Sequence, residues 1–345
     1  LEKEKLRNET SYVRCVAMAL ETRPDYCREK EIDVMLNLGC TRVELGVQSI
    51  YDSVLKKSER GHTLKDSIEA TRLMKDSFLK VGYHVMPGLE SSDMKKDIEM
   101  FKEIFSNPDY MPDFLKIYPC MVMPGTKLNE KYSLGKFKPL TTKEAASLIA
   151  EGKQYIPKFC RVQRIQRDIP TKVVAGGVDV TNLRQHVDDE MKIRKIKCRC
   201  IRCHEPKDKP IGEAKMHRLD YDASCGQEVF LSIEDKNNTL IGFCRMRKPY
   251  RPFRKEITSN TVGIRELHVY SPSLAIGTKD DFSVQHRGYG TKLMLEAERI
   301  AVEDFGAKKI AVISGIGVKE YFARKLNYKK DGIYMSKIFS KGLFR

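Results

Sequence analysis

The sequence has no apolar run close to the roughly 20 residues that a membrane-spanning helix needs. It also lacks the features of a secretory signal peptide, because residues 1–7 are mostly charged and no apolar stretch follows them. Long biased tracts are absent as well, since the 41% hydrophobic and 32% charged residues are spread along the chain. These absences exclude membrane-spanning, fibrous and disordered proteins, so we expect a globular protein of the cytosol.

Acidic residues are too few to balance the basic ones. The chain has 47 Asp and Glu against 63 Lys and Arg, which gives a net charge of +16. A field of that sign attracts polyanions, and in the cytosol nucleic acid is the first polyanion to consider. A lysine-rich surface that serves only solubility is the alternative.

The first part of the chain alternates strands and helices. Apolar runs predict strands at residues 13–20, 41–48, 81–86 and 114–118. Amphipathic helices are predicted between them, one ended by Gly39, one capped by Thr63, and one that starts near Met94. The strands recur at a spacing of about 35 residues, which suits the βαβ crossovers of a parallel sheet or barrel.

The later part of the chain has a different order. Residues 191–218 are densely basic and contain clustered cysteines, which indicates a linker or small module. Strands are predicted at 229–233, 240–245 and 263–270, and a long helix at 291–305. Since 345 residues exceed the usual size of one hydrophobic core, we predict a βα domain at 1–190, a Cys-rich linker at 191–212 and an α+β domain at 213–345.

A glycine-rich turn opens the long helix of the α+β domain, and its residues are Gln285, His286, Arg287, Gly288, Tyr289, Gly290 and Thr291. Backbone N–H groups at a helix N-terminus bind anions, and glycine lets the backbone approach them closely, so we expect a diphosphate here. Strands at 309–314 and 334–339, with a helix between them, complete an order that is similar to GNAT-type acetyltransferases. That similarity implies acetyl-CoA as the ligand and Tyr321 as the acid that protonates the departing thiolate. An ordinary core tyrosine is the alternative.

Glu266 and His268 are two further catalytic candidates, because they lie two apart on the predicted strand 263–270 and therefore share a face. Either side chain is a candidate base or positioning group beside the acetyl group. A hydrogen-bonded strand pair without a catalytic role is the alternative.

A series of short strings occurs in order along the chain: Glu21–Asp25, Arg42–Ser49, Arg60–Thr63, His84–Gly88, Lys116–Pro119, Arg164–Pro170, Arg265–Tyr270 and Ile310–Gly315. Together they resemble the catalytic third subunit of Elongator over essentially the whole chain. The resemblance implies a radical S-adenosylmethionine (SAM) barrel fused to a GNAT-type acetyltransferase domain. The implied activity is acetyl-CoA-dependent modification of the transfer RNA wobble uridine at C5, towards 5-carboxymethyluridine. It leaves open whether other Elongator-like subunits are required.

The same likeness gives candidates for the SAM site, namely Glu44, Gln48, Arg60, His84 and Lys116. They fall at the ends of predicted strands or in the loops that follow, where a barrel collects its ligand-binding groups. Lys116 is also a catalytic candidate. Buried ion pairs that only fasten strand ends are the alternative.

The sequence departs from this family in its cysteines. Radical enzymes of this type hold a [4Fe–4S] cluster through three closely spaced cysteines after the first strand, and no such array precedes residue 13. Cys15, Cys27 and Cys40 are too widely spaced. We therefore expect the cluster ligands upstream of Leu1, in an N-terminally truncated partial barrel that does not perform the radical step alone.

Cys198, Cys200 and Cys203 form a C-x-C-x-x-C array among basic residues. Nearby cations favour thiolates, and three thiolates at this spacing can share one tetrahedral Zn²⁺, which predicts a zinc-binding linker between the two domains. The candidates for a fourth ligand are His204, His217, Cys160 and Cys225. An iron–sulfur cluster and an unliganded trio are the alternatives. The eukaryotic members of the family lack a full counterpart of this array, which favours an archaeal or bacterial type.

Basic residues around the array predict an edge that contacts RNA phosphates, and they are Lys192, Arg194, Lys195, Lys197, Arg199 and Arg202. Arg161, Arg164 and Arg167 extend this edge, and a solvated charge run is the alternative. Two other functions stay open. One is a protein lysine acetyltransferase with a non-catalytic barrel, and the other is an RNA-binding scaffold with a silent coenzyme site.

Overall fold

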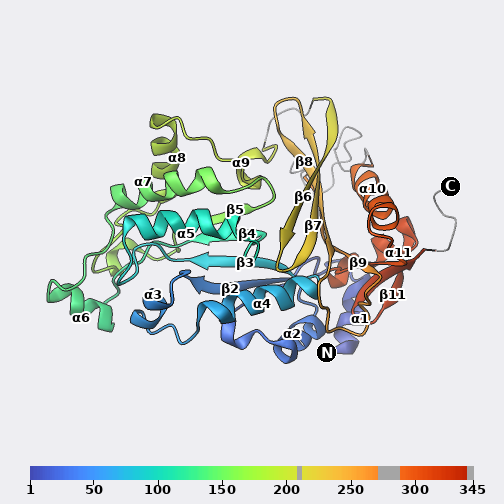
Figure 1. Cartoon of the computed structure of the whole chain (residues 1–345), viewed down its shortest axis with the longest axis horizontal. Helices are drawn as coiled ribbons and strands as arrows, with labels where there is room; N and C mark the ends of the chain where they lie inside the picture. Colours follow the sequence, from blue (N-terminus) through green and yellow to red (C-terminus); the bar gives the residue numbers. More distant parts are fainter. Residues whose placement is uncertain (208–211, 271–287, 340–345) are drawn as a thin grey trace.

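The computed structural model describes residues 1–207, 212–270 and 288–339 of the chain. A five-stranded sheet and a seven-stranded sheet dominate it, and they lie side by side in Figure 1. Among the described residues, no helix combines the length and the apolar character that crossing a membrane requires.

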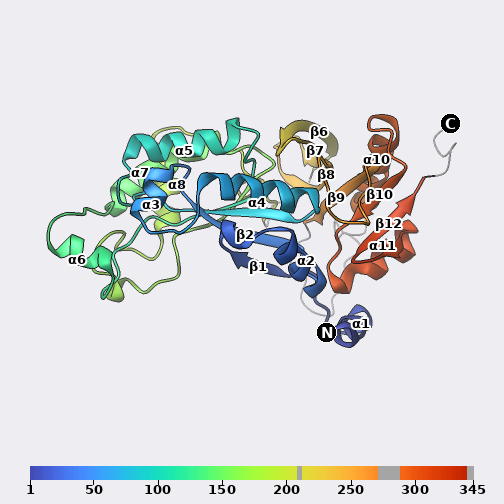
Figure 2. The same cartoon turned by 60° about the horizontal axis from the view of Figure 1, so that its bottom comes forward.

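The five-stranded sheet is parallel throughout, in the order β1-β2-β3-β4-β5. Its strands are β1 (Ala19–Thr22), β2 (Arg42–Gln48), β3 (Lys80–Val85), β4 (Phe114–Ile117) and β5 (Arg161–Ile165). The helices along this part are α2 (Glu29–Leu38), α3 (Asp52–Lys57), α4 (Leu64–Asp76), α5 (Met94–Ser106), α6 (Lys127–Ser133), α7 (Thr142–Gly152) and α8 (Leu183–Ile193). Figures 1 and 2 show α4, α5 and α7 together on one face of the sheet.

Local signals place these elements as the sequence predicts. The hydroxyl of Thr63 accepts a hydrogen bond from the N–H of Asp66, and the Asp66 carboxylate accepts one from the N–H of Thr63, so α4 begins with a capping box. Helix α2 ends at Gly39, whose φ is 94°. The strands predicted at 41–48, 81–86 and 114–118 are confirmed as β2, β3 and β4.

The strand predicted at residues 13–20 is wrong for most of its length, because β1 begins only at Ala19. Val13 and Val16 are 80% and 64% exposed instead of buried. Their segment follows α1 (Glu2–Thr10) along the other half of the molecule, where the carbonyl of Cys15 accepts a hydrogen bond of 2.9 Å from the N–H of Gly317. An apolar run does not by itself show whether a neighbouring strand is in position to form hydrogen bonds with it.

The seven-stranded sheet has the order β11-β12-β10-β9-β8-β7-β6, and only β9 and β10 run parallel. Its strands are β6 (Ala214–Ala223), β7 (Gly226–Asp235), β8 (Leu240–Lys248), β9 (Thr261–Val269), β10 (Lys309–Val312), β11 (Lys329–Asp331) and β12 (Tyr334–Ile338). Helices α10 (Tyr289–Glu303) and α11 (Lys319–Leu326) belong to this half, and the short α9 (Ile201–His204) precedes it. The sequence does not predict β6, because most side chains of this edge strand are exposed.

A buried ionic network joins the two sheets. The guanidinium of Arg265 on β9 donates to both carboxylate oxygens of Asp113 at 2.8 and 2.5 Å, and its Nε donates to Glu228 on β7 at 3.1 Å. Lys75 on α4 lies 3.5 Å from Glu228. Burial opposes ionisation of Asp113, but the charges of Arg265 and Lys75 outweigh it and hold the pKa of this carboxyl well below its usual range. Asp113 and Lys75 belong to the half with the parallel sheet and Arg265 and Glu228 to the other, so the network fixes the relative position of the two halves.

Apolar packing reinforces this contact. One hydrophobic cluster contains Phe78 and Leu79, just before β3, together with Phe230, Phe243 and Tyr334 of the seven-stranded sheet. A Cβ atom on Gly263 of β9 would lie 2.2 Å from the ring of Phe78. The aromatic ring therefore fills the space that a larger residue would take, and the two halves form one packed unit.

Candidate functional site

The open face of the parallel sheet carries a charged cluster. Glu44 on β2 accepts a hydrogen bond of 2.8 Å from Nε2 of His84 on β3, and the same carboxylate contacts the ammonium of Lys116 on β4. The second Glu44 oxygen lies 3.2 Å from the Arg42 guanidinium, and Nδ1 of His84 lies 3.2 Å from the exposed carboxylate of Glu21. The structure therefore brings together three of the residues predicted for the SAM site.

Glu44 should make the free energy of unfolding depend on pH in the acidic range. Burial disfavours its charge, but the hydrogen bonds from His84 and Lys116 outweigh burial and lower the pKa of Glu44 to about 2. A depressed folded-state pKa contributes stability above the unfolded value, and this contribution, roughly 3 kcal/mol, is lost as pH falls from about 5 to 2. In urea denaturation at several pH values, Glu44→Gln should flatten that loss. The exposed Glu99→Gln is the control and should keep the parental pH dependence.

Gln48 and Arg60 form a second group at the carboxyl end of β2. The Nε2 atom of Gln48 and a terminal nitrogen of Arg60 would lie 2.8 and 3.3 Å from a Cβ on Gly46. Among the described residues, the Oε1 atom of Gln48 and the Nε atom of Arg60 are buried without hydrogen-bond partners. Burial, helped by the charge of Arg23, lowers the pKa of Arg60. Unmatched amide and guanidinium groups suit a ligand with both a carboxylate and an ammonium, which the methionine part of SAM provides.

The seven-stranded sheet opens between β9 and β10. These strands pair only where Thr261–Ile264 lies beside Lys309–Val312, and β9 continues to Val269. Helix α10 begins beside this opening, and a Cβ on Gly290 would lie 3.0 Å from the hydroxyl of Tyr321 and 3.8 Å from Val269. The helix N-terminus, a strand edge and a phenol thus meet where a diphosphate-linked thioester can bind.

The glycine turn itself is described only in part. Gly288 is the N-cap of α10 with a φ of 71°, and Tyr289, Gly290 and Thr291 form the first turn of that helix. The other predicted residues, Gln285, His286 and Arg287, lie outside the described residues.

Glu266 and His268 are not on the face of β9 that Tyr321 approaches. A bulge shifts the β8–β9 register, so that Arg245 opposes Glu266 whereas Met246 opposes Ile264. Beyond the bulge Leu267 and Val269 pack with the α10 cluster, so Glu266 and His268 point to the other face, where Glu266 accepts a hydrogen bond of 2.7 Å from Arg245. The structure does not bring these two residues together with Tyr321, and their catalytic role stays a prediction.

Three residues that the sequence does not single out as a group meet on that other face. Glu205, which follows α9, accepts hydrogen bonds from Nε of Arg161 at 2.6 Å and from the hydroxyl of Tyr270 at 3.2 Å. These residues come from the parallel sheet, the Cys-rich linker and the end of β9. Because 44 and 65 residues separate Glu205 from its partners, no local pattern could have revealed the contact.

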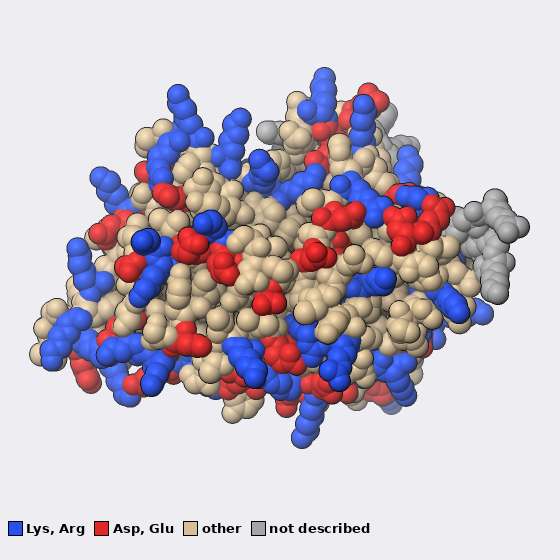
Figure 3. Space-filling model, viewed as in Figure 1, with Lys and Arg blue, Asp and Glu red and all other residues tan. Residues whose placement is uncertain are grey.

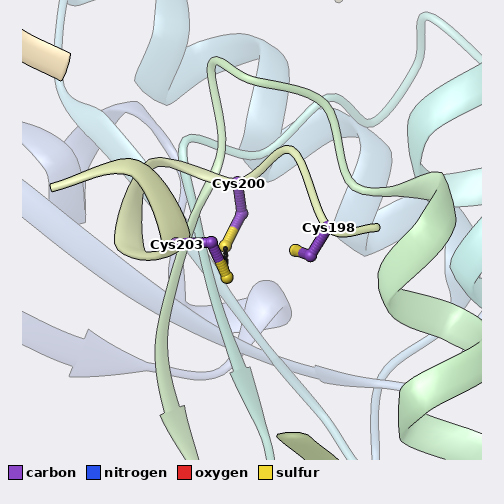
Figure 4. Close-up of side chains that lie close together, drawn as sticks. All are labelled: Cys198, Cys200 and Cys203. Carbon is purple, nitrogen blue, oxygen red and sulfur yellow. Dashed lines mark hydrogen bonds between the residues drawn. The ribbon is translucent and has the colours of Figure 1, made fainter. Parts of the chain in front are cut away.

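The cysteine array converges on one point in Figure 4. The three Sγ atoms lie within 4.8 Å of one another, and those of Cys200 and Cys203 are 3.6 Å apart. Zinc–sulfur bonds of about 2.3 Å in a tetrahedron separate thiolates by about 3.8 Å, so the array fits a single zinc ion. Hydrogen bonds among the three thiols lower the pKa of Cys200 and raise those of Cys198 and Cys203, so without a metal the trio shares its protons, and the case for zinc rests on the converging sulfur atoms.

No fourth ligand joins this group among the described residues. Nδ1 of His204 instead lies 3.1 Å from the carbonyl oxygen of Cys200. Cys160 is buried, and burial raises the pKa of its thiol. His217 lies on β6, and Cys225 lies in the turn between β6 and β7. These candidates for the fourth position therefore stay predictions.

All members of the predicted basic edge are exposed. Lys192 pairs with Asp189, Arg194 with Glu151 and Arg202 with Glu205. Within the described part of the chain, Lys195, Lys197 and Arg199 have no salt-bridge partner. Figure 3 shows Lys and Arg side chains projecting from the upper rim of this face, where α8 and α9 lie in Figure 1. The edge has cations available for an anionic partner.

Family models match three consecutive parts of the chain. The model of the radical SAM superfamily matches residues 1–101, and that of the radical SAM C-terminal domain matches residues 112–193. The model of the acetyltransferase (GNAT) family matches residues 197–328. The parallel sheet thus falls in the radical SAM matches, and the seven-stranded sheet falls largely in the GNAT match.

Relatives are similar over nearly the whole chain. The tRNA uridine(34) acetyltransferase of Methanocaldococcus infernus is 53% identical over 98% of this chain, which spans 65% of that relative's length. That of Dehalococcoides mccartyi is 43% identical, and this chain spans 75% of its length. Elongator complex protein 3 of Saccharomyces cerevisiae is 44% identical over 96% of this chain and 61% of its own length. A solved structure described as the archaeal Methanocaldococcus infernus Elp3 with an N-terminus deletion has a TM-score of 0.94, with 52% identity, and the match covers 98% of this chain and 82% of that one.

Proposed function

This chain belongs to the family of tRNA uridine(34) acetyltransferases and Elongator complex protein 3, and we propose on that basis that it modifies the wobble uridine of transfer RNA at C5. The modification uses acetyl-CoA and SAM and leads towards 5-carboxymethyluridine. The observation that carries the proposal is the fixed junction of a radical SAM sheet and a GNAT sheet through Arg265 and Asp113. We propose the division into a radical SAM domain at 1–190, a linker at 191–212 and an acetyltransferase domain at 213–345.

We assign SAM to the open face of the parallel sheet. Arg60 would meet its carboxylate, Gln48 its ammonium, and Glu44, held by His84 and Lys116, its ribose hydroxyls. When bound with a [4Fe–4S] cluster, SAM supplies the radical chemistry of the reaction. The three clustered cysteines fit a single ion, so we propose that other residues than these hold the iron–sulfur cluster.

We assign acetyl-CoA to the opening between β9 and β10. The N-terminus of α10, with Gly288 and Gly290, would bind the diphosphate through backbone N–H groups. The hydroxyl of Tyr321 stands beside this turn and would give its proton to the departing thiolate of the coenzyme. The basic edge of Lys192, Arg194, Lys195, Lys197, Arg199 and Arg202 would bind phosphates of the transfer RNA.

The cysteine array should hold one zinc ion for each chain. We expect Cys200→Ser to remove that zinc and to lower the thermal denaturation midpoint, because metal binding contributes directly to the stability of such linkers. Elemental analysis of the purified protein measures the first effect and calorimetry the second. The matched control is Cys15→Ser, a half-buried cysteine that is neither in the array nor a candidate for its fourth position, and this variant should keep its zinc. Iron at this array in place of zinc would contradict the assignment.

The decisive test is coenzyme A release by the full-length protein with SAM. We expect transfer RNA with a uridine at the wobble position to accelerate release, and the same transfer RNA with cytidine there to have no such effect. Equal rates of coenzyme A release with and without transfer RNA would contradict the proposed function. Acetylated basic peptides as the main product would favour a protein lysine acetyltransferase instead.

A further inference from the structure

The bulge in β9 presents an aromatic ring on the face directed to the parallel sheet. The ring of His268 is stacked on that of Phe243, with centroids 5.5 Å apart and an angle of 18° between the planes. Phe243 is buried, whereas His268 is exposed. One face of the imidazole thus packs on the buried Phe243 ring, and the rest of the His268 side chain is accessible to solvent.

Neighbouring groups fix this ring. Tyr270 lies next to it, with ring centroids 4.4 Å apart, and its hydroxyl donates to Glu205. Glu205 in turn accepts from Arg161, so a hydrogen-bonded wall holds the tyrosine against the imidazole. A ring that packing has already immobilised loses little further entropy when another ring stacks on it.

Two basic and two acidic side chains act on the ring of His268. Packing against Phe243 and Tyr270 partly desolvates the exposed His268 and lowers its pKa, and the charges of Lys80 and Arg161 act in the same direction, although the carboxylates of Glu266 and Glu205 oppose them. Lys80 is the first residue of β3 and has no salt-bridge partner in the described ranges. Lys80 and Arg161 are thus near enough for their charges to act on the imidazole.

We propose that His268 is a stacking platform for a nucleobase of single-stranded RNA, and that Arg161 and Lys80 contact the phosphates beside that base. Proteins recognise unpaired RNA bases by stacking them on aromatic side chains, with cations along the backbone. The inference rests on the proposed function and deepens it, because the base would be one of the anticodon loop. The platform is on the same strand as the coenzyme opening but on its opposite face, so RNA and acetyl-CoA would bind to two sides of β9.

The test compares binding of two ligands to the full-length protein. We expect His268→Ala to weaken binding of a transfer RNA anticodon stem-loop by roughly 5- to 150-fold, the range of one lost base–aromatic stack. Its affinity for acetyl-CoA should stay within about twofold of the parent, because that ligand is assigned to the other face. His268→Phe should restore most of the RNA affinity. The exposed His186→Ala on α8 is the matched control and should bind both ligands like the parent.

Two results would overturn the proposal. The first is unchanged RNA affinity in a folded His268→Ala protein, and the second is a loss that His268→Phe does not restore. The proposed function fails separately, when transfer RNA does not alter coenzyme A release. If transfer RNA does not alter coenzyme A release but stem-loop binding still requires an aromatic residue at position 268, the protein has the RNA platform and does not catalyse the proposed reaction.

Discussion

Arg265→Ala should lower the free energy of unfolding by about 3–5 kcal/mol, the usual cost of removing one partner from a buried ionic contact. The side chains of Arg265, Asp113 and Glu228 are all 0% exposed. Loss of the guanidinium removes the paired hydrogen bonds to Asp113 and the bond to Glu228, while both carboxylates stay out of water. Urea denaturation, followed by circular dichroism, measures the loss.

A surface arginine of the same sheet provides the control. Arg218 pairs with Asp304 at 2.5 Å, but the two side chains are 34% and 33% exposed. Its replacement by alanine should cost less than about 1 kcal/mol, since water screens such a pair. If Arg265→Ala costs no more than Arg218→Ala, the network does not hold the two sheets together.

Tyr321→Phe should slow coenzyme turnover by about 10²- to 10⁴-fold, the range expected for a general acid. The ring stays in place beside Gly290, so acetyl-CoA affinity should remain close to that of the parent. Stopped-flow detection of free coenzyme A gives the rate, and calorimetric titration gives the affinity. A slower rate with unchanged affinity would identify a group needed in the reaction and not in binding.

The control for this variant is Tyr250→Phe. Tyr250 is 60% exposed and lies outside the proposed coenzyme site, so its loss of a hydroxyl should leave both rate and affinity unaltered. Unchanged turnover in Tyr321→Phe would remove Tyr321 from the mechanism. Weaker RNA binding in the same variant would instead indicate a role on the RNA side.

Much of the fold is predictable from local sequence. Apolar runs predict strands β2 and β3, and the capping residues Thr63 and Asp66 predict the start of α4. Such features are readable from the sequence because they involve residues only a few positions apart. Strand β6 gives no such signal, since it pairs on one edge and exposes most of its side chains. Residues 13–20 show the opposite error, an apolar run that the structure leaves largely outside the sheet.

The candidate sites are predictable to a different extent. His84 and Lys116 lie side by side because they are register partners on the parallel strands β3 and β4, and Glu44 reaches them from the middle of β2, where its partner is Gly82. Glu266 and His268 are correctly placed on one face, but the bulge at Arg265 turns that face away from Tyr321. A single extra residue in a strand has no sequence signature, and it decides which of two sheet faces a side chain reaches.

Two contacts of the N-terminal segment can form only late in translation. Glu9 pairs with Lys319 at a sequence separation of 310 residues, and Arg14 with Glu320 at a separation of 306. A ribosome adds roughly 5–20 residues each second, so Glu9 waits on the order of 15–60 s for its partner to be synthesised. The radical SAM half can fold during that interval, and Lys5 can already donate its hydrogen bond of 2.8 Å to the carbonyl of Asn37, but the salt bridges of Glu9 and Arg14 form only after α11 emerges. The N-terminal segment therefore gains its full set of contacts only when synthesis of the acetyltransferase half is nearly complete.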